Sequence, residues 1–469
     1  MNVAYHLAGG LSQSQLQQTR ELVDSILWDI GVEIDHDGIL EFLAKQPGVR
    51  VQGKRVCYGR ELVEQALAQQ RTQNDDYVWQ WPGEVDWTMR PAYMCLHVYD
   101  AIAGKFHRSS LADVPQAAQL CDSYDMAGTC PVHAQDVPAP IRQIALAKTC
   151  IQNSRAVGKW MTVGNLDEIR CIVEMAQLAG RKGPHVILQI TISPLRLNVE
   201  YLDIIWKLRN SPDVAEGVTI GGGAIPMLGA TGPLGLPAAW AQAAAECIGS
   251  YITTKLIDPR MHAHACLQVF PFDLGSMAFV MGSPEGTLSQ LIGKQIQQHL
   301  FGRTFGSTFG SMGLSLDAQS AAERASNVLL SALAGSRIFY DVGMCPIDDM
   351  FCNEQVVVDH EIMQWVRRFI EGFEFKGDNA AALAAIREGL AEGNFFMQDW
   401  TLEHRKFYWH PELFRATMLS AFQSGDKKPL AQRARDIVEA RLGSHKFVLP
   451  DDVNAKIEQA YQKTTQKMA

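Results

Sequence analysis

The chain has 469 residues, of which 47% are hydrophobic and 20% are charged, and its formal net charge is −9. This length allows one large core with accessory segments. The acidic balance, without a basic stripe, excludes a general role in binding nucleic acids or anionic membranes. The N-terminus has no signal-peptide pattern, and no stretch is apolar enough to span a bilayer. We therefore expect a cytoplasmic protein whose ten scattered cysteines stay reduced.

The first 90 residues are expected to form a mainly helical accessory segment. Apolar side chains recur at helical spacing from Leu16 to Ile30, and Gly31 ends that pattern. A second helix is expected over residues 60–70. The alternating aromatic side chains of residues 77–81 predict a strand, and the Pro-Gly pair that follows predicts a turn.

The central part of the chain alternates short β-rich runs with helical stretches. Strands are expected over residues 93–98, 126–131, 158–163, 185–192, 216–221, 264–270, 303–308 and 337–342. Helices are expected over residues 112–123, 138–157, 165–181, 198–209, 236–254, 284–299, 317–333 and 354–375. This alternation predicts an α/β fold, namely a (β/α)8 TIM barrel over residues 91–376. Residues 105–108 suggest an inserted hairpin, and residues 377–469 a C-terminal helical extension.

In such a barrel the site lies at the C-terminal mouth of the strands, within the βα loops. The expected loops carry several aromatic residues and few basic ones. An aromatic box beside a carboxylate suits a cation that cannot donate a hydrogen bond, such as a quaternary ammonium group. Phe270 and Phe272 are equally compatible with simple packing of the barrel top.

Glycines are concentrated in two segments near this mouth, residues 221–237 and 301–313. Glycine lets a backbone approach a ligand closely, although turn geometry alone explains some of these positions. Neither segment contains the GxxxxGK[ST] pattern of a phosphate-binding loop, and the basic residue Arg303 falls at a strand start. The sequence therefore argues against a nucleotide site.

His262, His264 and Cys266 have the alternation that puts all three side chains on one face of a strand. They are candidate zinc ligands, but successive members of the set would be ~6.6 Å apart on a regular strand. They also lie at the strand's N-terminal entry, away from the mouth. We favour a structural role and expect no metal site.

The residues themselves point to a family. The matching segments are residues 131–138, 229–246, 282–295, 316–344, 353–362 and 394–414. In these segments, in their order and in their spacing, the chain resembles the trimethylamine methyltransferase family of corrinoid-dependent methyltransferases. The resemblance is strongest to members without pyrrolysine, such as the glycine betaine methyltransferases. It implies a (β/α)8 barrel and a homo-oligomer.

Two departures from the family pattern bear on the substrate. The position that corresponds to the pyrrolysine of the trimethylamine enzymes, the residue thought to bind and orient the methylamine, is occupied by Gly310. A quaternary nitrogen leaves as a neutral tertiary amine when its methyl group is attacked, so it needs no activation of this kind. The resemblance therefore implies a quaternary amine substrate. The second departure is Trp400, where many members are expected to have histidine.

The family's corrinoid is carried by a separate small protein. This chain has no DxHxxG cobalamin motif, and its nearest string, Asp359-His360, lacks the spacing and the glycine. We expect no cofactor bound by this chain and a corrinoid protein as its partner. Because cobalt(I) is already a strong nucleophile, the chain must bind the cation, aim one methyl group outward and exclude water. No side chain is assigned a catalytic role.

The resemblance and the loop positions together give the candidate substrate-binding residues. Phe272, Phe309 and Tyr340 are candidates for the cation box. Asp273, Glu285, Asp341 and Glu354 are candidates for the compensating charge. Gly310 would leave space for the corrinoid, and His133 and Gln135 would hydrogen-bond a substrate carboxylate. Glu285 and Glu354 also stand at expected helix starts, where capping is an equal alternative. The rival functions are a zinc-assisted methyltransferase and a barrel that binds a betaine without turnover.

Overall fold

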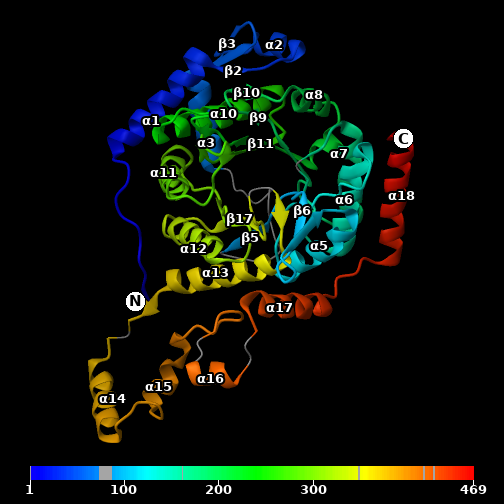
Figure 1. Cartoon of the computed structure of the whole chain (residues 1–469). Helices are drawn as coiled ribbons and strands as arrows, with labels where there is room; N and C mark the ends of the chain where they lie inside the picture. Colours follow the sequence, from blue (N-terminus) through cyan, green and yellow to red (C-terminus); the bar gives the residue numbers. More distant parts are fainter. Residues whose placement is uncertain are drawn as a thin grey trace.

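The computed structural model describes residues 2–72, 87–160, 162–346, 349–375, 377–415, 418–425 and 428–468. The chain has a mixed α/β fold in which helices surround a central group of strands (Figure 1). Within the described ranges the strands form six small sheets of two to five strands.

The central strands are parallel and form two of these sheets. The first contains β8 (Val186–Gln189), β11 (Val218–Ala224) and β13 (His262–Leu267), with β11 in the middle. The second contains β16 (Ser307–Thr308), β17 (Ile338–Val342) and β5 (Thr88–Pro91), with β17 in the middle. Isolated parallel bridges continue from one sheet toward the other, pairing Cys95 with Val132, Gly128 with Val157 and Trp160 with Val186.

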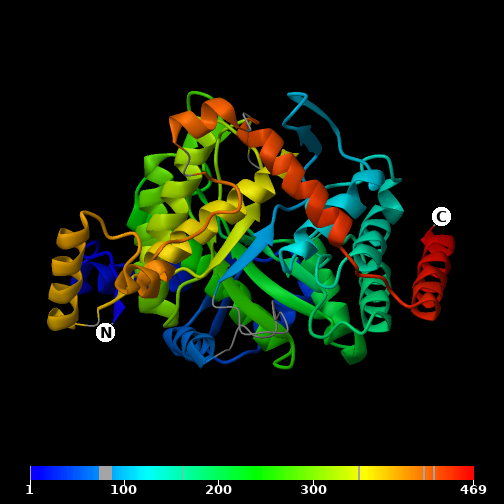
Figure 2. The same ribbon diagram turned by 90° about the horizontal axis from the view of Figure 1, so that it is seen from below.

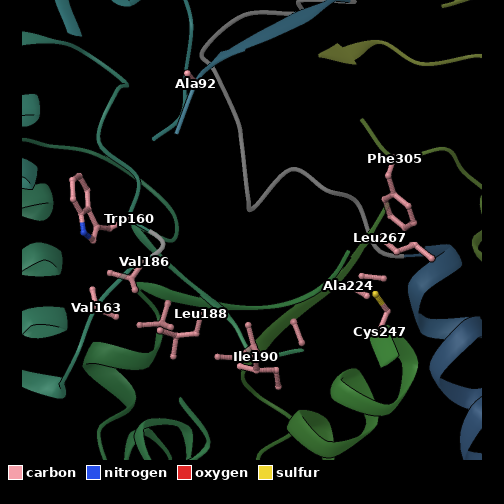
Figure 3. Close-up of a cluster of buried hydrophobic side chains, with 14 of the residues drawn as sticks. Ala92, Trp160, Val163, Val186, Leu188, Ile190, Ala224, Cys247, Leu267 and Phe305 are labelled. Atoms are coloured by element: carbon pink, nitrogen blue, oxygen red, sulfur yellow. The ribbon is translucent and has the colours of Figure 1, made fainter. Parts of the chain in front are cut away.

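The described strands do not close into a barrel, because no hydrogen-bonded ladder joins β13 to β16. We call this gap the β13–β16 seam. The side chain of Gln297 crosses it: its Nε2 donates to the carbonyl of Leu267 at 3.2 Å, and its Oε1 accepts from the backbone N–H of Phe305 at 3.0 Å. Figure 3 shows Phe305 beside Leu267. One amide side chain therefore connects two strands that do not pair through their backbones.

Each of the eight helices expected in the central region is present. They are α5 (Val114–Ser123), α6 (Ala139–Asn153), α7 (Leu166–Leu178), α8 (Val199–Leu208), α10 (Leu236–Ile257), α11 (Pro284–Phe301), α12 (Ala318–Leu333) and α13 (Asn353–Glu371). Side-chain caps fix several of their starts: Asn165 accepts from the N–H of Glu168 at 3.0 Å, and Ser283 from that of Gly286 at 3.1 Å.

The expected strands are less regular than the helices. The runs over residues 126–131 and 158–163 shrink to isolated bridges, and Gly158, with φ of +112°, breaks the extended conformation of the second. The run over residues 303–308 is reduced to the two residues of β16. The first strand, β5, lies upstream of the expected residues 93–98, where Met94 has a positive φ of 48°.

The N-terminal segment is helical in part. Its expected helices are α1 (Gln13–Ser25), extended by a π-helical turn at Ile26–Ile30, and α3 (Arg60–Thr72). The sequence did not reveal helix α2 (Asp37–Leu43) or strands β2 (Val32–Glu33), β3 (Val49–Gln52) and β4 (Arg55–Tyr58). These strands join β9 (Thr191–Ile192) and β10 (Arg196–Leu197) in a five-stranded sheet. The strand expected over residues 77–81 lies outside the described residues.

Short hairpins and a C-terminal extension complete the fold. Strands β6 (His97–Asp100) and β7 (Lys105–Arg108) form the expected hairpin, and β6 also pairs with β18 (Met350–Phe351). Strand β14 (Phe270–Asp273) pairs with β12 (Met227–Leu228) and with β15 (Ala278–Phe279). At the base of the extension, β1 (Asn2–Val3) pairs with β19 (Phe373–Glu374).

The last part of the chain is helical, as expected. Helices α14 (Asn379–Glu392) and α15 (Asp399–His404) project from the body, as Figures 1 and 2 show. Helix α16 (Leu419–Ser424) follows, α17 (Leu430–Ser444) packs on α13 and α5, and α18 (Asp451–Met468) packs on α6 and α7. None of the helices in the described ranges combines the length and the apolar character needed to cross a lipid bilayer.

The central strands have two faces of different chemistry. Val186 and Leu188 of β8 are buried with Ile190 in an apolar cluster that also contains Cys247 of α10 (Figure 3). Since side chains alternate along a strand, Gln189 lies on the opposite face. That face also carries Gly221 and Gly223 of β11, because a Cβ atom at either glycine would meet Oε1 of Gln189 at 2.2 Å. The apolar face contacts the helices, and this polar face is turned to the inside of the ring.

Candidate active site

The ends of β16 and β17 bring four of the expected site residues together. The backbone N–H of Phe309 donates to the carbonyl of Tyr340 at 3.0 Å, which extends the pairing beyond the end of β16. The hydroxyl of Thr308 donates to the carboxylate of Asp341. Asp341 has a φ of +67°, a conformation that is uncommon for residues other than glycine. Phe309, Gly310, Tyr340 and Asp341 are thus adjacent at the C-terminal ends of two neighbouring parallel strands.

Gly310 is buried and held by hydrogen bonds at both its N–H and its carbonyl. Its N–H donates to Oγ1 of Thr308 at 2.7 Å, and its carbonyl accepts from Nδ2 of Asn327 at 3.1 Å. A Cβ atom at this position would lie 2.6 Å from both Cβ and Sδ of Met281, closer than real Cβ contacts allow. The thioether of Met281 therefore occupies the place where a side chain at position 310 would begin.

Phe309 and Tyr340, two of the expected cation-box residues, already have ring contacts within the protein. Phe309 is fully buried, and its ring lies edge-on to Phe339 with the centroids 6.0 Å apart. The ring of Tyr340 lies 5.3 Å from the guanidinium carbon of Arg90, within the range of a cation–π contact. The backbone at Gly306 also lies close to this ring, since a Cβ there would meet Cε2 of Tyr340 at 2.1 Å.

The two phenylalanines of β14 differ in their surroundings. Phe270 is buried and lies edge-on to Phe279, with ring centroids 4.9 Å apart, so the packing alternative holds for this residue. Phe272 is only partly buried and stands opposite Phe279 in the β14–β15 hairpin. Phe272 is therefore more accessible than the fully buried Phe309.

The carboxylate of Asp273 is used by its own turn. It accepts hydrogen bonds from the backbone N–H groups of Gly275 and Ser276, both at 3.0 Å, and these bonds together with the Ser276 hydroxyl lower the pKa of Asp273. Glu285 is exposed in the first turn of α11, directly after the Ser283 cap. Asp273 therefore stabilises its own turn. Glu285 stands in the first turn of α11, where its negative charge interacts favourably with the helix dipole.

Glu354 connects the body to the C-terminal extension. Its side chain is buried and forms an ion pair with Arg435 of α17, whose guanidinium also donates to Asp100 at 3.0 Å. Its second oxygen accepts from the thiol of Cys352 at 3.2 Å. The charge of Glu354 is therefore balanced within the chain.

Gln135 and His133 have different roles. Oε1 of Gln135 accepts from Nη2 of Arg108 at 2.7 Å, and Nε2 donates to the carbonyl of Leu96, so this amide holds the β6–β7 hairpin. Nε2 of His133 lies 3.4 Å from Nη1 of Arg142, while its buried Nδ1 has no hydrogen bond to the residues that the structure describes. Burial and the Arg142 charge lower the pKa of His133, which is neutral at pH 7 as a result.

His264 of β13 is buried and lies beside a side chain of the neighbouring strand β11. Nδ1 of His264 lies 3.2 Å from the hydroxyl of Thr219, and burial lowers the pKa of His264 to about 4. Over the described ranges of the chain, no group of three His, Cys, Asp or Glu side chains could hold a metal ion.

Lys294 of α11 is a buried polar residue that the sequence did not reveal. Its ammonium group donates to the carbonyls of Phe305 and Gly306, at 2.5 and 2.8 Å, on the β16 side of the seam. Burial lowers the pKa of Lys294 to about 7. In the sequence, a lysine between glutamines on a long helix reads as part of a solvated face.

This burial predicts a pH dependence of stability. The folded-state pKa of Lys294, about 7, lies below its ordinary value of 10.5, so the unfolded chain binds more protons between these pH values. The unfolding free energy contributed by this group should therefore rise from about pH 7 to about pH 10.5. We expect the difference in unfolding free energy between the wild type and Lys294→Met to rise over this interval in urea titrations. A difference that does not change with pH would contradict the depressed pKa.

Comparisons with known proteins agree with the resemblance seen in the sequence. A family model described as "Trimethylamine methyltransferase (MTTB)" matches residues 5–469. The chain is 23% identical over 445 residues to the glycine betaine methyltransferase of Desulfitobacterium hafniense strain Y51, covering 91% of this chain and 90% of the relative. It is 25% identical over 362 residues to trimethylamine methyltransferase MttB of Methanosarcina barkeri, covering 73% of this chain and 70% of the relative.

A solved structure, a hydroxylamine complex of MtmB, shares the fold with a TM-score of 0.50 at 9% identity, covering 98% of this chain and 87% of that one. The family match spans almost the whole chain and includes the segments that form the ends of β16 and β17. The chain therefore belongs to the trimethylamine methyltransferase family and is a methyltransferase.

Proposed function

We propose that this chain transfers a methyl group from a quaternary amine, glycine betaine or a similar compound, to the cobalt(I) centre of a corrinoid carried by a separate protein. The observation that carries the proposal is the glycine at position 310, together with the filled space beside it. Glycine offers no group that could activate an amine, and Met281 lies where a side chain would start. A quaternary amine needs none, since its leaving group is a neutral tertiary amine.

We propose that the fold is a (β/α)8 barrel over residues 91–376, with an accessory segment over 1–90 and a helical extension over 377–469. Parallel pairings and bridges support this, because they run from β13 through β11, β8 and the bridged segments to β5, β17 and β16. In the described ranges the seam is the one interruption of that circuit, and Gln297 crosses it.

In this proposal the corrinoid is bound by the partner protein. The two residues of this chain that come nearest to a cobalamin motif, Asp359 and His360, have other contacts. Asp359 is fully buried and bonds to Arg324, while the ring of His360 packs against that of Tyr124 with the centroids 4.5 Å apart. Both side chains thus have partners within the protein. When bound through the partner, the corrinoid supplies the nucleophile for the methyl group.

The chain's own residues then bind and orient the substrate. We propose Phe272 as the aromatic wall that receives the ammonium group, because Phe309 is enclosed and Tyr340 already faces Arg90. Asp341, at the end of β17, supplies the compensating charge, and the hydroxyl of Thr308 fixes its carboxylate. No proton has to be delivered to the leaving amine, which suits a mouth whose His133 is neutral.

We also propose that the reaction takes place in the cytoplasm and that the protein is a homo-oligomer. The ten cysteines, nine of them buried, form no disulfides in the part of the chain that the structure describes, which suits a reducing compartment. Apolar side chains exposed in the turn between the projecting helices α14 and α15, such as Phe396 and Met397, suit contact with a second copy.

Methylation of protein-bound cob(I)alamin tests the function. The purified chain, a corrinoid-binding protein and a reductant would be mixed with glycine betaine, carnitine, proline betaine or choline, with trimethylamine as the control. We expect at least one quaternary amine to remove the cob(I)alamin absorbance and trimethylamine to leave it unchanged. Activity with trimethylamine alone would overturn the proposal, and betaine binding without methylation would show a binding protein instead.

A further inference from the structure

Helix α11 presents polar side chains to the β13–β16 seam. Lys294 donates to the carbonyls of Phe305 and Gly306, and Gln297 bonds to the backbones of Leu267 and Phe305. These two side chains define the direction in which the inner face of α11 points. That direction is toward the gap where the two central strands do not pair.

Gln290 lies on the same face, nearer the C-terminal ends of the strands. At 100° per residue, its side chain leaves the helix about 20° from that of Gln297 and about 40° from that of Lys294, between the two. Four residues of helix place it about 6 Å along the axis from Lys294, toward the start of α11. One turn earlier, Thr287 contacts Asn327, which in turn donates to the carbonyl of Gly310. Gln290 therefore lies between the level of Gly306 and the level of Gly310.

The amide of Gln290 is buried and without a partner. The residue is 3% exposed, and neither Nε2 nor Oε1 hydrogen-bonds to any residue that the structure describes. Its helix neighbour Ser289, by contrast, donates to the carbonyl of Val269 at 2.7 Å. An unpaired buried amide destabilises a fold, so its presence beside a substrate site calls for a ligand that completes its hydrogen bonds.

We propose that Gln290 binds the carboxylate of a betaine through the seam, with Nε2 as the donor. The inference rests on the proposed function and adds to it the residue that binds the carboxylate of the substrate. The ammonium end has no hydrogen-bond donor or acceptor, so only the polar end of the substrate can satisfy this amide. Gln135 is the other amide expected to bind a carboxylate, but both of its polar atoms already hydrogen-bond to Arg108 and Leu96 at the β6–β7 hairpin.

Calorimetric titration of the full chain with three ligands tests the inference. The probes are glycine betaine, tetramethylammonium and choline, and the variant is Gln290→Met, which keeps the length of the side chain and removes both polar atoms. We expect Gln290→Met to weaken glycine betaine binding about tenfold or more, as for one lost hydrogen bond to a charged group, and to leave tetramethylammonium binding unchanged. An equal loss for all three ligands, or a selective loss for choline, would overturn the carboxylate assignment.

Gln297→Met is the matched control, because it changes the same residue type on the same face of the helix. It should lower the melting temperature, since it breaks the bonds to Leu267 and Phe305, while the preference for betaine over tetramethylammonium stays as in the wild type. Gln290→Met should melt at or above the wild-type temperature without ligand, because it removes an unpaired amide. A lower melting temperature would show that the amide has a structural partner and would overturn the proposal.

The two proposals fail in different ways. If the wild type binds none of the three ligands and no quaternary amine removes the cob(I)alamin absorbance, the proposed function fails. If the wild type binds glycine betaine and Gln290→Met binds it equally well, the proposed function stands and the role of Gln290 fails.

Discussion

An Asp359→Asn variant is expected to lose about 3–5 kcal/mol of unfolding free energy, because removing one member of a buried ion pair leaves the other charge uncompensated. Asp359 and Arg324 are both 0% exposed, and both carboxylate oxygens lie 3.2 Å from Nη1 of Arg324. The carboxylate also accepts from the N–H of Gly343 at 2.8 Å, and Arg324 donates to the carbonyl of Met344. The pair thus holds the turn that follows Asp341.

Urea unfolding of the variant measures this loss. The exposed pair of Arg367 and Glu371 on α13 provides the control, and Glu371→Gln should cost less than about 1 kcal/mol. Replacing both buried partners, as Arg324→Met with Asp359→Leu, should recover much of the loss because no charge is left unpaired. Equal effects of the buried and the exposed single variants would show that the buried pair does not support the turn.

The helices were predictable from the sequence because their signals are local. Ser283 and Pro284 predict the start of α11, and in the structure Ser283 caps the helix that begins at Pro284. Strands are stabilised by neighbours far away in the chain, so a run of residues with β-propensity does not always form a strand. Residues 158–163 have the composition of a strand, yet Gly158 has a positive φ, and of the described residues in this run only Trp160 forms a bridge.

The candidate site was predictable only where neighbouring strands bring residues together. Phe309 and Gly310 meet Tyr340 and Asp341 because β16 and β17 pair in parallel, which follows from their order in the chain. The partners of Glu354 could not be foreseen, since Arg435 lies 81 residues away in a separate helical segment.

Buried polar residues on helices were missed for a related reason. In the sequence, Gln290 and Lys294 have the composition of a solvated helix face. Only the missing ladder between β13 and β16, a property of the assembled fold, shows that this face points at a gap between strands. The position of Gln290 at this gap is what separates it from an amide on a helix face that is exposed to water.

Substitution of Gly310 is expected to have a large effect on methyl transfer. Gly310→Ala is expected to lower the rate of methyl transfer about 100-fold, because a shift of about 1 Å at a site can have that effect. The new Cβ would lie 2.6 Å from Met281, so either Met281 or the strand end must move. Overpacking should also lower the unfolding free energy by about 1–3 kcal/mol. Methyl-transfer assays and urea unfolding of the same preparations measure both effects.

A double-mutant cycle with Met281→Ala separates this contact from general damage. Met281→Ala alone removes a buried thioether and should cost about 2–5 kcal/mol. Combined with Gly310→Ala, the loss should be smaller than the sum of the two single losses by about 0.5 kcal/mol or more, because the contacts with Sδ and Cγ of Met281 disappear while the contact with its Cβ remains. Gly443→Ala in α17, where a Cβ meets nothing within 4 Å, should be neutral or stabilising. Additive losses at 310 and 281 would mean that the two residues do not share this space.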